Sequence, residues 1–215
     1  MKQYGPWQIK ESNTVYSDPF VDLQVDQVIR PDGKDGQHVV VTIKPGVCVI
    51  ALDENQNVHL TKEFHYAVGR DSLEAVSGGI EPGDEALATA KRELQEEIGF
   101  VADTWQHLTT VDPFTTCMKS PTELYLATGL TATECSPEGT ELIEMVKMSL
   151  DQAVEYSAKE RLLTPRPVSH CCWCRVGLAL SRPTPGKLGW AKSPPYGNFS
   201  KNVLDTDSPP AYCTR

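Results

Sequence analysis

Three glutamates lie close together in the segment RELQEE, residues 92–97. On a helix, Glu93 and Glu97 are four residues apart and share one face, and Glu96 lies three residues from Glu93. Like charges at this spacing destabilise an isolated helix. Carboxylate oxygens are also the ligands that Mg²⁺ and Mn²⁺ prefer in proteins. The pattern therefore predicts a site for a divalent cation, with Arg92 as the neighbouring cation that can orient a carboxylate.

The residues around this cluster predict the elements that must position it. A glycine pair, Gly78-Gly79, permits a loop whose backbone approaches its neighbours closely. Asp84 is placed to cap a helix predicted over residues 84–98, and Gly99 is placed to end it. The apolar stripe of this helix is expected to comprise Leu87, Ala90 or Lys91, Leu94 and Ile98, which recur at helical spacing.

The rest of the chain combines β-branched runs with few helices. Strands are predicted over residues 20–30, 38–43, 46–52, 58–66 and 123–130, and a short amphipathic helix over residues 150–160. This pattern predicts an α+β fold with a mixed sheet. Residues 164–215 contain eight of the 16 prolines and no glutamate, which predicts an irregular tail.

The segment from Gly78 to Phe100 resembles the box of the Nudix hydrolases. That box reads Gly, five residues, Glu, seven residues, then Arg-Glu-aliphatic-x-Glu-Glu-x-Gly-aliphatic, and its spacing fits this chain throughout. Two positions depart from it, with Asp84 at the first Glu and Phe100 at the last aliphatic residue. The segments TVYSDPFVDLQVDQV and EFHYAVGRDSLEAVSGG are similar to the ADP-ribose pyrophosphatase branch of the family.

The resemblance implies a Nudix α/β/α sandwich with a mixed β-sheet, preceded by an N-terminal β segment. The expected division is an N-terminal β segment over residues 1–45, which could mediate dimerisation, a Nudix domain over residues 46–163, and a tail over residues 164–215. The implied reaction is Mg²⁺-dependent hydrolysis of a pyrophosphate bond in a nucleoside diphosphate derivative, with Mn²⁺ as the alternative ion. ADP-ribose, cleaved to AMP and ribose 5-phosphate, or a nucleotide sugar is the leading substrate.

The resemblance also implies roles for individual residues. The metal ligands would be Glu93, Glu96, Glu97 and the carbonyl of Ser77. The catalytic set would comprise Arg92, Glu96, Glu97 and a general base, Glu138 or Glu141, in the acidic loop that follows the ATGL strand. The substrate contacts would be His65, Arg70, Gly78 and Gly79. His65 stands where the branch often has Arg, a departure that bears on the choice of substrate.

Charge and hydropathy limit the partners. The formal net charge of −9 argues against a nucleic-acid or anionic-membrane surface, and a divalent cation would screen an anionic substrate from it. No apolar run is long enough for a membrane span, and the N-terminus does not resemble a signal peptide. We therefore expect a cytoplasmic protein that forms a homodimer and binds a nucleotide-derived small molecule.

Two other functions fit the same residues. One is house-cleaning hydrolysis of modified nucleotides or dinucleotides. The other is a catalytically silent Nudix domain that senses a nucleotide or binds a protein. A silent domain should have lost carboxylates from the box, whereas this chain retains Glu93, Glu96 and Glu97.

Overall fold

The computed structural model describes residues 1–136 and 142–163 of the 215-residue chain. The predicted tail over residues 164–215 lies outside the described residues, as do Glu138 and Glu141. In chain order the described elements are β1 (Lys2–Tyr4), β2 (Trp7–Ser17), β3 (Val21–Ile29), β4 (Asp35–Ile43), β5 (Gly46–Leu52), β6 (Asn57–His65), β7 (Arg70–Glu74), β8 (Val76–Gly79), α1 (Ala86–Ile98), β9 (Phe100–Val111), β10 (Met118–Lys119), β11 (Thr122–Ala132), β12 (Glu144–Ser149) and α2 (Leu150–Leu163).

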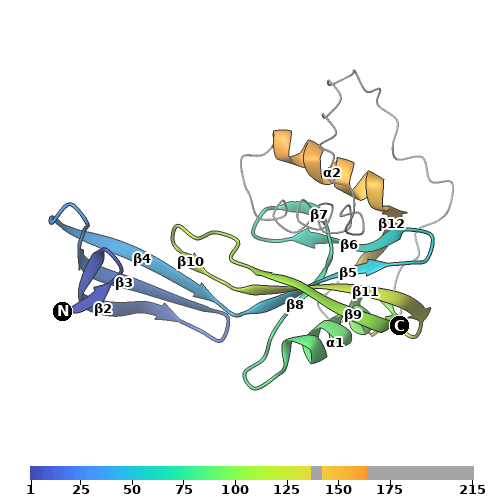
Figure 1. Ribbon diagram of the computed structural model, residues 1–215, viewed down its shortest axis with the longest axis horizontal. Coiled ribbons are helices and arrows are strands. Elements are labelled where there is room, and N and C mark those ends of the chain that lie inside the picture. Colours follow the sequence, from blue (N-terminus) through green and yellow to red (C-terminus); the bar gives the residue numbers. More distant parts are fainter. Residues whose placement is uncertain (137–141, 164–215) are drawn as a thin grey trace, which may run out of the picture.

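The larger sheet is mixed and lies between the two helices. Its strand order is β12-β6-β5-β11-β9, with β7 paired to β6 and β8 paired to β5. Strand β11 runs parallel to β5, and the other pairs in this sheet are antiparallel. Helix α1 covers one face of the sheet and α2 lies on the other (Figure 1). This arrangement confirms the predicted α/β/α sandwich.

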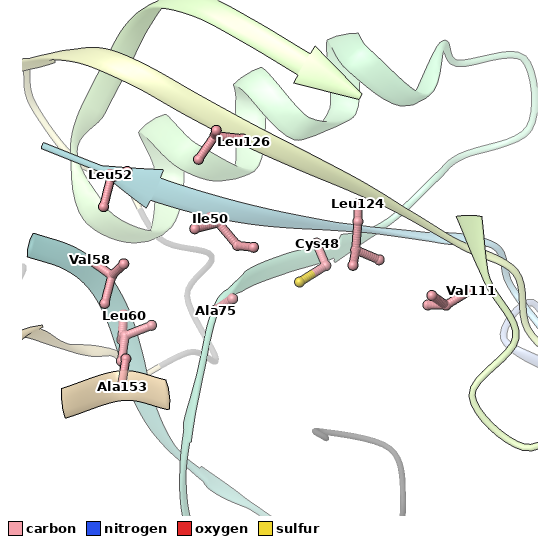
Figure 2. Close-up of a cluster of buried hydrophobic side chains, with 10 residues drawn as sticks. All are labelled: Cys48, Ile50, Leu52, Val58, Leu60, Ala75, Val111, Leu124, Leu126 and Ala153. Atoms are coloured by element: carbon pink, nitrogen blue, oxygen red, sulfur yellow. The ribbon is translucent and has the colours of Figure 1, made fainter. Parts of the chain in front are cut away.

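Strand β5 explains why both helices are needed. Its sequence GVCVIAL is apolar without alternation, and every residue after the first is buried. Cys48, Ile50 and Leu52 face the core that Ala153 of α2 completes (Figure 2). Val47, Val49 and Ala51 face the core beneath α1. Burying one such side chain fully contributes about 1.5–3 kcal/mol, so a central strand of this composition requires cover on both faces.

The predicted N-terminal β segment supplies strands β1 to β4 of a second sheet, whose strand order is β1-β2-β3-β4-β10, and β10 comes from a later part of the chain. Its three long strands, β2 to β4, project away from the sandwich (Figure 1). The β3–β4 hairpin turns at Gly33, whose φ of 79° suits glycine. Several large apolar side chains of this sheet and its turns remain exposed, namely Tyr4, Val15, Tyr16, Phe20 and Val39.

Helix α1 departs from expectation at its start. The N-cap is Glu85, with no side-chain capping bond, so the prediction that Asp84 caps the helix was wrong. Asp84 belongs to the preceding turn, because its N–H donates to the carbonyl of Glu81 at 3.0 Å. Leu87 is 37% exposed and does not join the core, whereas Glu97 is buried. Gly99 ends the helix in the left-handed conformation, as predicted.

A polar cluster is buried at one end of the larger sheet. His59 on β6 is 5% exposed, and its Nε2 lies 3.6 Å from Oδ2 of Asp53. Lys147 on β12 places its Nζ 2.7 Å from the same oxygen, and the Phe100 ring packs against the imidazole. Burial lowers the pKa of His59, and the charge of Lys147 adds to this effect against the opposing influence of Asp53.

This cluster predicts a stability that depends on pH. Because the folded-state pKa of His59 is lowered, the unfolded chain binds a proton at His59 below about pH 6.5 that the folded chain does not. The free energy of unfolding should therefore fall as the pH decreases through this range. His59→Gln should reduce the slope, measured by urea unfolding between about pH 5 and pH 7.5. Equal slopes for the variant and the wild type would contradict this assignment.

Candidate active site

The predicted glycine loop and the predicted acidic helix meet at Gly78. Strand β8 pairs with β5, which places Gly78 opposite Val47 and Gly79 opposite Gly46. A Cβ atom added at Gly78 would lie 2.1 Å from both Cδ and Oε1 of Glu93. The carboxylate of α1 therefore occupies the space that a side chain on β8 would fill, and only glycine permits this contact.

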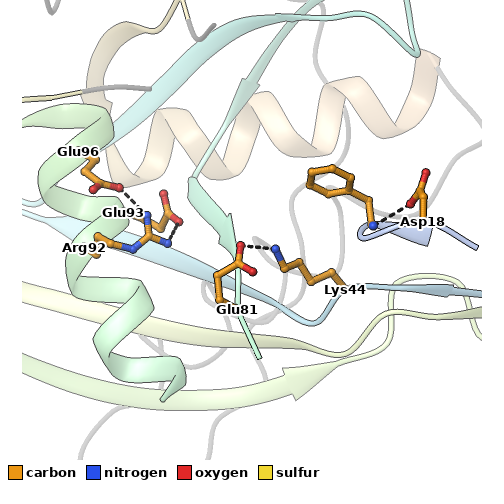
Figure 3. A network of polar contacts seen from close by, with 7 residues as sticks. Asp18, Lys44, Glu81, Arg92, Glu93 and Glu96 are labelled. Carbon is orange, nitrogen blue, oxygen red and sulfur yellow. Dashed lines mark hydrogen bonds and ion pairs between the residues drawn. The ribbon is translucent and has the colours of Figure 1, made fainter. Parts of the chain in front are cut away.

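Arg92 joins two of the three carboxylates. Its Nη2 lies 2.6 Å from Oε1 of Glu93, and its Nη1 lies 2.5 Å from Oε2 of Glu96 (Figure 3). Burial alone would lower the pKa of Arg92, but the two carboxylates outweigh it and raise the pKa above its ordinary value. The Glu93 side chain is 12% exposed and that of Glu96 is 31% exposed. The guanidinium thus compensates part of the negative charge that the helix gathers.

Glu97 adds a third carboxylate to the same helix and is 7% exposed. Within the described part of the chain, no three His, Cys, Asp or Glu side chains already form a group that could hold a metal ion. Arg92 instead takes one oxygen each of Glu93 and Glu96. The donors are nevertheless hard carboxylate oxygens on one helix, beside a backbone that approaches closely at Gly78. Their chemistry fits a divalent cation.

The loop between β8 and α1 is attached to the chain that precedes β5. The N–H of Ile80 donates to the carbonyl of Pro45 at 2.8 Å. Glu81 forms an ion pair with Lys44 (Figure 3). These contacts join the loop to the junction between β4 and β5. Sequence reasoning did not identify Lys44, because its partner is 37 residues away along the chain.

His65 and Arg70, the expected substrate contacts, are cross-strand neighbours on the β6–β7 hairpin. His65 Nε2 lies 3.3 Å from Oε1 of Glu74, so the imidazole already faces a carboxylate of the protein. Arg70 is exposed, and its Nη1 makes one long contact of 3.4 Å to the carbonyl of Asp71. Ser77 lies next to Gly78 on β8, three residues after Glu74.

The acidic loop after β11 returns to the C-terminal end of α1. The N–H of Thr133 donates to the carbonyl of Gly99 at 2.8 Å, and the N–H of Ser136 donates to the carbonyl of Glu96 at 3.2 Å. The expected bases, Glu138 and Glu141, follow directly but lie outside the described residues.

A cavity of about 370 Å³ lies elsewhere, in the N-terminal sheet. Lys10, Gln27, Val28, Asp35, Gly36 and Gln37 line it, and none of them belongs to the box. The carboxylates, the glycines and Arg92 are therefore a better guide to the active site than this cavity. Among the described residues, no helix is both long and apolar enough to cross a membrane.

Comparison with known proteins identifies the class. The NUDIX domain model matches residues 42–176, so the chain belongs to the Nudix family and is a Nudix hydrolase. The model of the nucleoside diphosphate sugar hydrolase N-terminal domain matches residues 7–41, which places the chain in the branch that resembles ADP-ribose pyrophosphatases.

Individual relatives support this placement. The chain is 30% identical to an ADP-ribose pyrophosphatase of Bacillus subtilis, over 66% of this chain and 77% of that protein. It is 33% identical to one of Mycobacterium tuberculosis, over 55% and 58% respectively. It is 25% identical to a methanol dehydrogenase activator of Bacillus methanolicus, over 74% and 86%. The crystal structure of an ADP compounds hydrolase shares the fold, with a TM-score of 0.64 at 20% identity, covering 83% of this chain and 97% of that one.

The contact at Gly78 yields a prediction. Gly78→Ala should lower kcat by about 100-fold, because the new methyl group displaces the Glu93 carboxylate by about an ångström or more. The fold should survive, since the atoms that must move belong to a flexible side chain. Steady-state kinetics and a melting curve measure the two effects.

Gly36→Ala in the N-terminal sheet is the matched control, because the atoms nearest to its Cβ belong to the flexible side chain of Arg30. Near-wild-type turnover of the Gly78 variant would show that the position of Glu93 does not matter for catalysis.

Proposed function

We propose that this protein hydrolyses the pyrophosphate bond of a nucleoside diphosphate linked to a sugar, with ADP-ribose as the leading substrate. The arrangement of Glu93, Glu96, Glu97 and Arg92 against Gly78 carries the proposal. The names of the Bacillus subtilis and Mycobacterium tuberculosis relatives support ADP-ribose. Hydrolysis of ADP-ribose would yield AMP and ribose 5-phosphate.

Glu93, Glu97 and Glu96 would hold the divalent ion, Mg²⁺ or Mn²⁺, with the carbonyl of Ser77 as a further ligand. When bound, the ion neutralises phosphate charge and lowers the pKa of a coordinated water. The chain must then hold these carboxylates in position while the ion neutralises their charge. Arg92 would do this, because it binds one oxygen of Glu93 and one oxygen of Glu96.

A general base would remove the proton from the attacking water. Glu138 and Glu141 are the candidates, and the hydrogen bond from Ser136 to the carbonyl of Glu96 supports them. That bond brings the described start of their loop to the turn of α1 that carries two of the carboxylates.

Arg70 and His65 would contact the substrate phosphates, with the backbone at Gly78 and Gly79 beside them. Within residues 1–136 and 142–163, the exposed guanidinium of Arg70 makes one long hydrogen bond, which supports a role in binding an anion. His65 shares its site with Glu74, so its contribution to phosphate binding would be weaker than that of the Arg common in the branch.

A substrate panel tests the proposed function. The panel should contain ADP-ribose, an ADP-sugar, a diadenosine polyphosphate, and a CMP-linked compound chosen because a relative from Streptomyces rubellomurinus is named as a CMP-phosphonate hydrolase. We expect the highest kcat/KM for ADP-ribose, with AMP and ribose 5-phosphate as products and no turnover after chelation. Preference for the dinucleotide would favour a house-cleaning hydrolase instead. No turnover of any compound with either ion would favour a silent nucleotide-binding domain.

A single substitution tests the metal assignment. Glu97→Gln keeps the shape of the side chain but removes a hard anionic ligand, so kcat should fall by about 100-fold or more while the fold is retained. Glu85→Gln is the matched control, because Glu85 is an exposed glutamate at the other end of the same helix. Turnover of the Glu97 variant within a few-fold of wild type at saturating Mg²⁺ would overturn the assignment.

We also propose that two copies of the chain associate through the N-terminal sheet. Its exposed apolar side chains include Val15 at 57% and Tyr16 at 55%, and an interface between two copies would bury apolar surface of this kind. Light scattering should give twice the chain mass, and Val15→Asp should shift the equilibrium toward the monomer. A wild-type mass equal to that of one chain at micromolar concentration would refute the dimer.

A further inference from the structure

The short strand β8 is held on both of its faces. Neighbouring residues of a strand point to opposite faces, so Gly78 and Gly79 present opposite sides. On one side, the Glu93 carboxylate packs against Gly78. On the other, a Cβ on Gly79 would lie 3.0 Å from Cδ of Lys44, so the methylene stem of that lysine lies against the glycine. The end of β8 is thus enclosed between Glu93 and Lys44.

Lys44 is itself well fixed. Its side chain is 17% exposed, and its ammonium group forms the ion pair with Glu81 in the loop that leads from β8 to α1. The same ammonium lies 5.5 Å from the centroid of the Phe20 ring, and the backbone N–H of Lys44 donates to the carbonyl of Phe20 at 3.2 Å. Asp18 fixes that turn by accepting from the N–H groups of Phe20 and Val21, each at 2.7 Å.

We propose that Lys44 is a positioning residue for the metal site. Through its ion pair with Glu81 it holds the loop after β8, and so keeps the backbone of Gly78 against the Glu93 carboxylate. The ammonium need not touch substrate or metal for this role. The inference rests on the proposed function, because it assumes that Glu93 binds the divalent ion.

The sign of one measured change separates positioning from simple electrostatics. Lys44→Met keeps most of the stem and removes the positive charge. If Lys44 acted only through its charge, its removal would reduce repulsion of a cation and tighten metal binding. If Lys44 holds the loop, its removal should weaken metal binding, because Gly78 and Glu93 lose their fixed relation.

The experiment measures Mn²⁺ binding to the full chain by electron paramagnetic resonance, without substrate. We expect Lys44→Met and Glu81→Gln each to raise the Mn²⁺ Kd about fivefold, and the double variant to raise it no further, because the two residues act as one unit. Lys44→Arg should restore binding to within about twofold of wild type, since it retains the charge. Lys10→Met is the matched control, because it breaks an ion pair with Asp35 in the N-terminal sheet.

Three results would overturn the proposal. Unchanged or tighter Mn²⁺ binding by Lys44→Met would exclude positioning. Effects of Lys44→Met and Glu81→Gln that add in the double variant would show that they do not act through each other. A raised KM with an unchanged Mn²⁺ Kd would make Lys44 a substrate contact. Glu93→Gln is measured in parallel, because wild-type Mn²⁺ binding by that variant would refute the metal assignment itself.

Discussion

The close contact between the backbone of β8 and the Glu93 carboxylate is the constraint on which the active site depends. A strand and a helix normally keep the distance that their side chains impose. At Gly78 there is no side chain, and the carboxylate fills the space. This contact brings the polar N–H and C=O groups of the β8 backbone next to a carboxylate of α1. It also explains why the glycine pair and the acidic helix must occur together in one chain.

Charge is the second constraint on α1. Three carboxylates within about one helical turn repel one another, and each pair spaced three or four residues apart costs an isolated helix a few tenths of a kcal/mol. Two features outweigh this cost. The apolar side of the helix, including Leu94 and Ile98, is buried against the sheet, and Arg92 binds two of the carboxylates directly. The fold can therefore maintain a concentration of negative charge that is suited to a divalent cation.

The two sheets meet where the active-site loop is attached. Strand β4 belongs to the N-terminal sheet and β5 to the sandwich, and the residues between them contact the loop through Lys44 and Pro45. Because Lys44 also contacts Phe20, the position of the N-terminal sheet and the position of the loop are physically linked. An association between two copies through that sheet would act on the same junction.

Residues 78–100 by themselves determined the family, the acidic helix and its end at Gly99, because these features depend on local spacing and on backbone freedom. Most of the apolar strands, and β5 most clearly, could likewise be predicted from the sequence. Strand β9 was missed, because as the edge of its sheet it carries many exposed polar residues and lacks clear alternation. Local signals also placed the helix cap one residue too early, at Asp84, because a turn and an N-cap favour the same residue types.

Only the tertiary structure decided which distant groups meet. The burial of His59 beside Asp53 and Lys147, the pairing of His65 with Glu74, and the contact of Lys44 with Glu81 all join residues from different strands or loops. Nothing in local spacing encodes these pairs, because the sheet register and the attachment of the loop after β8 to the β4–β5 junction bring them together. The sequence alone was therefore sufficient to predict which residues could do the chemistry, and the packing of the fold decided what holds them in place.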